Sequence, residues 1–166
     1  MREIYIFGHK NPDTDTVLSA LILEAIEKTM GVDNVKAYRL GEINKETEYA
    51  LNYFGAKAPE LLEEVEEGQP VMLVDHNEFG QSVKGIDKAK ILRVVDHHKI
   101  ANFETHEPLF YMAMPVGCTA TILRDMCNVS GIKIDKVTAG LMLSAIISDT
   151  LLLKSPTCTE KDKEAA

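Results

Sequence analysis

Residues 7–15 read Phe-Gly-His-Lys-Asn-Pro-Asp-Thr-Asp, and this stretch decides the fold. The apolar run Ile-Tyr-Ile-Phe of residues 4–7 leads into it and predicts a strand buried on both faces, as in a parallel sheet. A helix is expected next, with Asn11 as its N-cap and Pro12 as its first residue. The stretch therefore places one imidazole and two carboxylates, those of His9, Asp13 and Asp15, on a strand-to-helix loop.

Two later segments repeat this design of an apolar strand that ends in Asp and His. Val-Met-Leu-Val at residues 71–74 leads into Asp75 and His76, and residues 91–95 lead into Asp96-His97-His98. The carboxyl ends of parallel strands lie at one edge of a sheet, where ligands of open α/β folds bind. We therefore expect the three groups to converge on a shared site.

The rest of the chain alternates between strand and helix patterns. Strands are expected at about residues 2–7, 35–40, 70–74, 91–95 and 109–114, with the last at an edge, and helices at about 12–28, 44–55, 119–129 and 136–147. The acidic residues 56–69 are interpreted as a solvated helix face or loop, and the apolar triplet 151–153 as strand-like. The pattern predicts an α/β fold with a mostly parallel five-stranded sheet and helices on both faces.

Composition narrows the class of protein. The 166 residues suit one domain, and a net charge of −8 without Trp argues against a nucleic-acid partner. The three cysteines have no CxxC spacing, which is typical of reduced thiols inside the cell. No signal peptide is evident, and the longest apolar stretch is too short to span a membrane. We expect a cytoplasmic protein.

Histidine and carboxylates without thiolates suit a divalent ion such as Mn²⁺, Mg²⁺ or Co²⁺. Two such ions that share a water could direct it at phosphorus. The candidate ligands are His9, Asp13, Asp15, Asp75, His97 and Asp149, the last at the end of an apolar helix. No P-loop, GxGxxG or GxSxG motif is present.

Each candidate alone has a plainer interpretation. An Asp after a strand is often only a helix N-cap, His76 could fill a polar pocket, and His106 has the surroundings of a surface residue. A serine nucleophile at Ser144 or Ser148 has no evident base. Cys118 could be an activated thiol at a helix N-terminus, but the metal ligands make such a nucleophile unnecessary. The metal interpretation rests on convergence, because four of the five histidines follow strand ends with Asp nearby.

Five stretches of the sequence carry a family resemblance. They are residues 8–15, 74–78 (Val-Asp-His-Asn-Glu), 96–98 (Asp-His-His), 115–121 (Pro-Val-Gly-Cys-Thr-Ala-Thr) and 144–150 (Ser-Ala-Ile-Ile-Ser-Asp-Thr). In this order they resemble the motifs of the family II inorganic pyrophosphatases, manganese-dependent enzymes of the DHH phosphoesterase superfamily. The resemblance extends from residue 2 to the end of the chain.

The resemblance implies that two divalent ions, Mn²⁺ or alternatively Co²⁺ or Mg²⁺, form the catalytic centre. The implied ligands are His9, Asp13 and Asp75 for the first ion, and Asp15, Asp75, His97 and Asp149 for the second, with Asp75 as the bridge. The implied substrate contacts are His98 and Gln81, with Asp96 and His76 as supporting residues. A hydroxide between the ions would attack pyrophosphate directly and release two phosphates.

The family also has a second, C-terminal domain with Arg and Lys residues that bind pyrophosphate, and nothing here resembles it. Thr159 and Asp162 predict a capped helix start close to the last residue. We therefore expect residues 1–166 to be the N-terminal metal-binding domain of a longer protein. It should bind metal and form the family's homodimer, yet hydrolyse pyrophosphate weakly or not at all.

Two other functions remain open from the sequence. A DHH phosphodiesterase of short oligonucleotides or cyclic dinucleotides would have similar metal ligands, although such enzymes usually carry Asp-Gly-Asp where this chain has Asp13-Thr14-Asp15. A metal-stabilised dimerisation module without activity is the second alternative.

Overall fold

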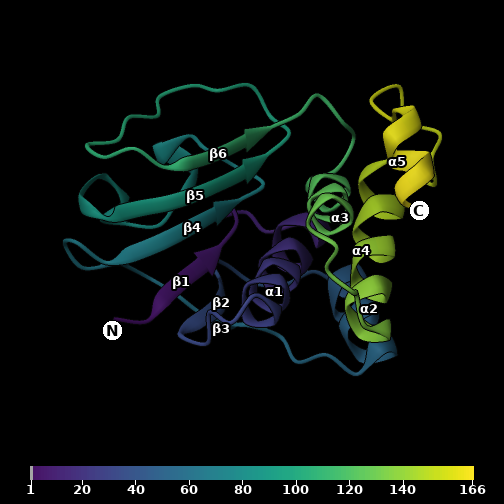
Figure 1. Ribbon diagram of the computed structural model, residues 1–166, viewed down its shortest axis with the longest axis horizontal. Helices are drawn as coiled ribbons and strands as arrows, with labels where there is room; N and C mark the ends of the chain where they lie inside the picture. The colour runs from purple at the N-terminus through teal and green to yellow at the C-terminus, as the bar shows by residue number, and fades with distance from the viewer. Residues whose placement is uncertain (1) are drawn as a thin grey trace.

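The computed structural model describes residues 2–166 and contains a six-stranded sheet in which all strands are parallel (Figure 1). Its strands are β1 (Ile4–Phe7), β2 (Val35–Arg39), β3 (Glu60–Leu61), β4 (Pro70–Val74), β5 (Lys90–Asp96) and β6 (Phe110–Ala113). Their order across the sheet is β3-β2-β1-β4-β5-β6. The predicted α/β class is confirmed, and β6 lies at an edge as expected.

The prediction of five strands was one short. The additional strand, β3, pairs Glu60 and Leu61 with Tyr38 and Arg39 of β2. It lies within the acidic segment of residues 56–69, which the sequence indicated to be a helix face or loop. Two exposed residues present no apolar run, so hydrophobic periodicity has nothing to detect there.

The strand order reverses between β1 and β4. From β1 the chain moves outward through β2 and β3, and from β4 it moves the other way through β5 and β6. In open α/β sheets such a switch point leaves a crevice at the carboxyl ends of the two central strands. Residues 8–15 follow β1 and Asp75 follows β4, so both border this crevice.

Five α-helices connect and cover the strands. They are α1 (Thr14–Thr29), α2 (Lys45–Phe54), α3 (Thr119–Ser130), α4 (Lys136–Asp149) and α5 (Glu160–Ala165). The expected N-cap of the first helix was wrong: Asp13, and not Asn11, accepts the hydrogen bond from the backbone N–H of Thr16. The predicted capping arrangement of Thr159 and Asp162 is present at the start of α5.

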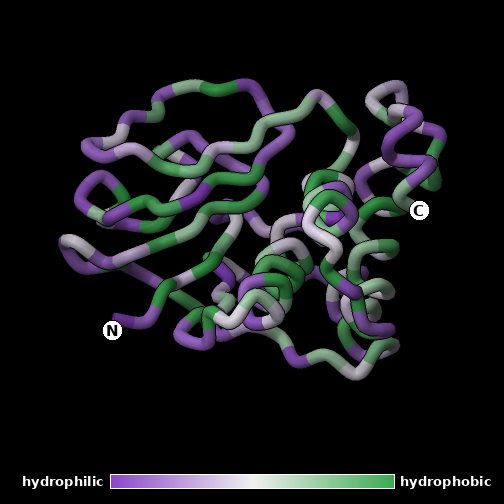
Figure 2. Tube along the Cα trace, in the orientation of Figure 1, coloured by the Kyte–Doolittle hydropathy of each residue, from purple (hydrophilic) through white to green (hydrophobic). Residues whose placement is uncertain are grey.

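The two faces of the sheet are covered differently. On one face the strands share a core with all five α-helices, centred on α1, as the apolar interior in Figure 2 shows. On the other face, within residues 2–166, loops and the short 3-10 helices η1 (Phe79–Gln81) and η2 (Ile86–Lys88) cover a smaller core. The sequence predicted helices on both faces of the sheet, but within residues 2–166 the α-helices cover one face and only 3-10 helices lie on the other.

The apolar triplet 151–153 is not strand-like. Leu151, Leu152 and Leu153 all have positive φ, between 50° and 64°, and form a left-handed turn directly after α4. The turn lets the N–H of Leu152 bond to the carbonyl of Ile147 and so completes the helix end. It leaves the side chains of Leu151 and Leu152 exposed.

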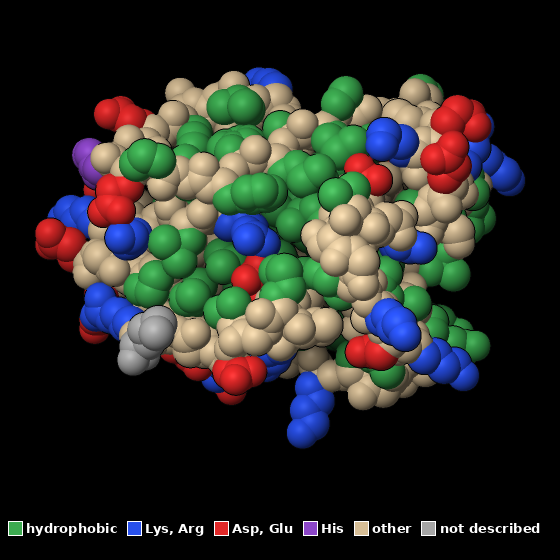
Figure 3. All heavy atoms as spheres, in the orientation of Figure 1, with side chains coloured by type: hydrophobic (Ala, Val, Ile, Leu, Met, Phe, Trp, Pro, Cys, Tyr) green, Lys and Arg blue, Asp and Glu red, His purple; other side chains and the backbone are tan. Residues whose placement is uncertain are grey.

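The surface separates apolar from charged side chains. Figure 3 shows hydrophobic side chains gathered across the middle of one face, with most Lys, Arg, Asp and Glu side chains around its rim. Among residues 2–166, no helix combines the length and the apolar character needed to cross a membrane.

Candidate metal centre

The first group of potential ligands comes from the loop after β1 and the end of β4. His9 Nε2 lies 3.6 Å from Asp13 Oδ2 and 3.4 Å from Asp75 Oδ2. Asp13 also caps α1 through its other oxygen, Oδ1, which leaves Oδ2 free to face His9. The Asp13 side chain is half exposed, so this first group opens toward solvent.

The second group joins four separate segments of the chain. His97 Nε2 lies 3.2 Å from Asp75 Oδ1, 3.7 Å from Asp149 Oδ2 and 3.8 Å from Asp15 Oδ2. In both groups the candidate ligand atoms lie within 4.8 Å of one another. Cis ligands of an octahedral ion with bonds of about 2.1 Å lie about 3 Å apart, so a small contraction would suit a divalent ion.

Asp75 belongs to both groups and divides its two oxygens between them. Oδ2 faces His9 of the first group, and Oδ1 faces His97 of the second. The carboxylate is 1% exposed, and it also accepts hydrogen bonds from Thr16 Oγ1 and Thr119 Oγ1. Its backbone has φ of 57°, an uncommon conformation for a side-chain-bearing residue that concentrates at functional sites.

His97 shows most directly that the second group fits a cation. Its Nδ1 contacts the carbonyl of Val116 at 2.9 Å, and because a carbonyl only accepts, Nδ1 carries the proton. In the neutral ring that binds a metal ion, Nε2 would then direct its lone pair at these carboxylates. That atom is buried and has no hydrogen-bond partner within the described residues, 2–166. A metal ion would satisfy it.

Burial and the close approach of several carboxylates shift the pKa values of the residues in the two groups. Burial alone would lower the pKa of His9, but Asp13 and Asp75 outweigh burial and raise it to about 10. Burial and the charge of Asp75 raise the pKa of Asp15, and burial with the charges of Asp15 and Asp75 raises that of Asp149. These raised pKa values reflect buried carboxylates close to one another, whose mutual repulsion divalent cations would relieve.

His98 and Gln81 lie on the open side of the first group. They help to line a pocket of about 300 Å³, together with His9, Asn11, Asp75, His76, Asn77, Glu78 and Lys99. His98 Nδ1 contacts Asp96 Oδ1 at 2.7 Å, a bond that raises the pKa of His98. Asp96 is fully buried and accepts a second bond from Asn77, so it fixes the orientation of the His98 ring.

His76 has a different environment from the other strand-end histidines. Its Nδ1 contacts the carbonyl of Val74 at 2.9 Å, and its Nε2 contacts Ser82 Oγ at 3.0 Å. Burial lowers its pKa to about 4, so the ring is neutral at pH 7. Both nitrogens contact groups outside the ligand set, which fits the polar-pocket interpretation, and a supporting role at the metal stays a prediction.

Several residues that hold the candidate ligands were not singled out from the sequence. Thr119 donates its N–H to Asp15 Oδ2 at 2.8 Å, and Ser19 donates its hydroxyl to Asp15 Oδ1 at 2.7 Å. Ser19 lies one helical turn after Asp15, a spacing that could have suggested the contact. The distance of 104 positions between Asp15 and Thr119 offered no such signal.

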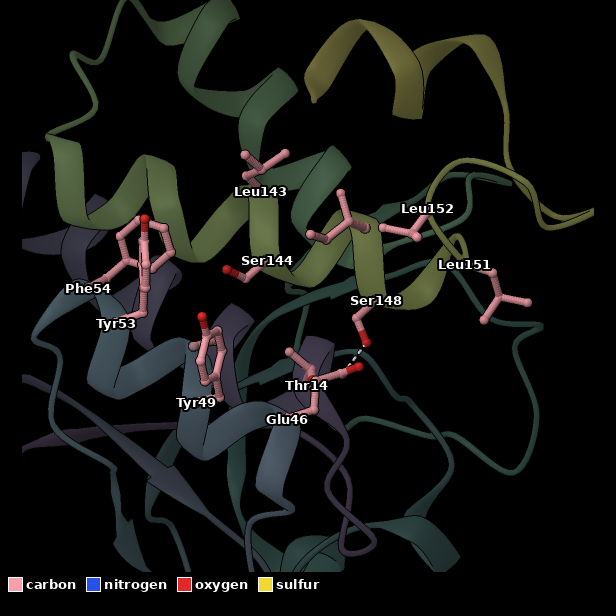
Figure 4. Close-up of a pocket in the computed structure, with 12 residues that line it drawn as sticks. Thr14, Glu46, Tyr49, Tyr53, Phe54, Leu143, Ser144, Ser148, Leu151 and Leu152 are labelled. Carbon is pink, nitrogen blue, oxygen red and sulfur yellow. Dashed lines mark hydrogen bonds between the residues drawn. The ribbon is translucent and has the colours of Figure 1, made fainter.

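An apolar groove of about 680 Å³ lies beside the second group, between α2 and α4 (Figure 4). At its polar end Glu46 of α2 accepts hydrogen bonds from Thr14 and Ser148. These two residues immediately adjoin Asp13, Asp15 and Asp149 in sequence. Glu46 thereby links the start of α1 to the end of α4.

Cys118 is fully buried, and burial raises the pKa of its thiol, which makes it a poor nucleophile.

Comparison with known proteins agrees with this geometry. Residues 3–146 match the model of the DHH family, N-terminal domain. The chain belongs to the DHH family. This DHH domain is 61% identical over 166 residues to a probable manganese-dependent inorganic pyrophosphatase of Staphylococcus carnosus, and 58% identical over 167 residues to one of an Exiguobacterium species. These matches cover all of this chain and 54% of the length of each relative.

Solved structures confirm the fold of the DHH domain. A Methanococcus jannaschii protein assigned to the family II inorganic pyrophosphatases superimposes with a TM-score of 0.90 at 43% identity, covering 98% of this chain and 54% of that one. An exopolyphosphatase-related protein from Bacteroides fragilis has a TM-score of 0.73 at 15% identity, which indicates the fold alone. The chain spans about half the length of the curated relatives it matches.

Proposed function

We propose that this chain provides the dinuclear metal centre of a manganese-dependent inorganic pyrophosphatase. The observation that carries the proposal is the division of Asp75, whose two oxygens face two separate groups of ligand-type atoms. The names of the relatives from Staphylococcus carnosus and Exiguobacterium support manganese and pyrophosphate. The carboxylate-rich ligand set without thiolates suits Mn²⁺, and Co²⁺ or Mg²⁺ are the alternatives.

The proposed ligands are those predicted from the sequence. His9, Asp13 and Asp75 would hold one ion, and Asp15, Asp75, His97 and Asp149 the other. Bound divalent ions lower the pKa of a water between them and neutralise charge on phosphate oxygens. The four carboxylates of the two groups would otherwise repel a polyanion.

The chain's own residues would position the substrate beside the ions. His98 is partly exposed in the pocket, and its bond to Asp96 keeps Nδ1 occupied and Nε2 available. A protonated His98 would donate a hydrogen bond to a phosphate oxygen of pyrophosphate, and the raised pKa of His98 favours that form. Gln81 offers an amide on the same side of the pocket.

Binding of pyrophosphate by this chain alone should be weak. Of the residues that line the pocket within the described chain, Lys99 is the only Lys or Arg. We expect residues 1–166 to bind metal but to hydrolyse pyrophosphate poorly, because one lysine and one histidine neutralise little of the substrate charge. Efficient phosphate release by the purified chain, with Mn²⁺ and micromolar pyrophosphate, would contradict this expectation.

The phosphodiesterase alternative predicts a different substrate preference. Phosphate release from pyrophosphate should be compared with cleavage of a 5′-phosphorylated dinucleotide, using both the chain and a full-length relative such as that of Staphylococcus carnosus. Preference of the full-length protein for pyrophosphate supports the proposal, whereas preference for the dinucleotide would replace it. Metal-dependent stabilisation with neither activity in the full-length protein would leave the dimerisation module as the function.

We also propose that the domain forms a homodimer and acts in the cytoplasm. Strand β6 is a sheet edge with unpaired backbone groups, and its Phe110 is 47% exposed, which are features of a strand that pairs with a second copy. The three free thiols suit a reducing compartment. Sedimentation of the chain tests the dimer.

A further inference from the structure

A single loop supports the second group of ligands. Residues 116–121, a loop that ends the connection from β6 and includes the first turn of α3, make polar contacts with three of the candidate ligands. The contacts join Thr119 N–H to Asp15 Oδ2 (2.8 Å), Thr119 Oγ1 to Asp75 Oδ1 (3.1 Å), and His97 Nδ1 to the Val116 carbonyl (2.9 Å). A displacement of this loop would therefore move the second group much more than the first.

Both sides of this loop are attached to one buried carboxylate, that of Asp162 in α5. Asp162 Oδ2 accepts the N–H of Gly117 at 2.9 Å, and Oδ1 accepts the hydroxyl of Thr121 at 2.7 Å. These two donors flank Thr119, which makes the contacts to Asp15 and Asp75. A Cβ added at Gly117 would lie 3.0 Å from Asp162 Oδ2, so the loop is seated closely against the carboxylate.

Asp162 also caps its own helix, so its carboxylate has two distinct sets of contacts. Thr159 donates both its N–H and its hydroxyl to Asp162 Oδ2, each at 2.7 Å. The side chain is fully buried, and burial would raise its pKa, but the bonds from Thr121 and Thr159 outweigh burial and lower it. The carboxylate is consequently ionised at neutral pH and bonds strongly to both sets of donors.

We propose that Asp162 is a positioning residue for the second ion, acting through residues 116–121 on Asp15, Asp75 and His97. This inference rests on the proposed metal centre and extends it to a residue of α5 that has no contact with any ligand. Its contacts with Gly117 and Thr121 fix the loop between them. Residues that orient metal ligands typically change metal affinity by 10–100-fold when they are lost.

Two matched variants separate positioning from stability. Thr121→Val and Thr159→Val are near-isosteric, and each removes one hydroxyl that donates to Asp162 at 2.7 Å. Thr121→Val releases α3 from the carboxylate, whereas Thr159→Val weakens only the cap of α5. Both should lower the melting temperature of the metal-free chain by similar amounts, so stability alone cannot distinguish them.

The readout is the dissociation constant of each Mn²⁺ ion, measured by calorimetric titration of the full chain. The two binding steps are assigned with His9→Gln, which damages the first group, and His97→Gln, which damages the second. We expect Thr121→Val to weaken the second ion about 10-fold and the first ion less than twofold. Thr159→Val should change neither ion more than twofold. Asp162→Asn should weaken the second ion at least as much as Thr121→Val.

Each other outcome overturns a defined part of the account. Equal dissociation constants for Thr121→Val and wild type, with two ions bound, would overturn the role of Asp162 and leave the metal centre intact. Equal weakening by Thr121→Val and Thr159→Val would reduce Asp162 to a structural residue. Failure of the wild-type chain to bind Mn²⁺ would overturn the proposed centre and this inference together.

Discussion

The first and second ligand groups share Asp75 but are built in different ways. The first group takes His9 and Asp13 from a single short loop, and its carboxylate Asp13 is 50% exposed. The second group takes its residues from four segments, and Asp15 and Asp75 are almost fully buried. Two of the three residues of the first group lie within nine consecutive residues, whereas the second group exists only once the sheet, α1 and α4 have packed.

This difference assigns a different physical role to each group. Hydrogen bonds donated by Ser19 and Thr119, and one accepted by the Val116 carbonyl, constrain the second group before any ion binds. Pre-organised ligands lose little conformational entropy on binding, so the second group should hold its ion tightly. The first group faces the pocket lined by His98 and Lys99, where it is accessible to substrate.

The largest expected effect comes from Asp75→Asn, which removes charge from both groups. We expect the affinity for both Mn²⁺ ions to fall by more than about 100-fold, because loss of a supporting residue alone costs 10–100-fold. Calorimetric titration measures both steps. Loss of one ion with the other unchanged would show that Asp75 does not join the groups.

The next effect separates the groups. His97→Gln should weaken the second ion by about 100-fold and spare the first, and His9→Gln should do the reverse, since His9 faces Asp75 Oδ2 and His97 faces Asp75 Oδ1. The Mn²⁺ stoichiometry of each variant, measured by equilibrium dialysis at fixed free metal, checks the split. If either variant lost both ions equally, the two groups would not be separate sites.

A moderate effect is expected from pH on the metal-free chain. The pKa of His9 is raised from 6.5 to about 10, so the stability it contributes is complete below pH 6.5 and disappears as pH rises toward 10. The raised pKa values of His97 and Asp149 act in the same direction. The melting temperature should fall between pH 6.5 and 10, and the stabilisation by Mn²⁺ should grow. If the melting temperature of the metal-free chain rose over this range, that result would contradict the raised pKa values of these residues.

The smallest effect is predicted for His106→Ala. His106 is exposed and lies outside both groups, so its loss should change stability by no more than about 0.5 kcal/mol and neither Mn²⁺ dissociation constant. It serves as the matched control for the histidine variants. Weakened Mn²⁺ binding in this variant would show that the titrations report on total histidine content.

The sequence predicted the central strands and the placement of the candidate ligands well. Strands β1 and β4 are almost continuous apolar runs, and β5 is an apolar run interrupted by Arg93. Parallel sheet geometry then brings their ends together. The contacts that orient the ligands could not be predicted in this way. Thr119 and Asp162 act across 104 and 45 residues on Asp15 and Gly117, and such pairs have no local periodicity. Leu151–Leu153 was misinterpreted because its composition indicates a strand, while the end of α4 imposes a turn.

The most direct test of the account is a crystal structure of the chain grown with Mn²⁺ and recorded at the manganese absorption edge. We expect two anomalous peaks about 3.5–4 Å apart, with Asp75 Oδ1 bound to one ion and Oδ2 to the other. His97 Nε2 should coordinate the second ion, and His9 Nε2 the first. A single peak, or two peaks that do not share Asp75, would contradict it.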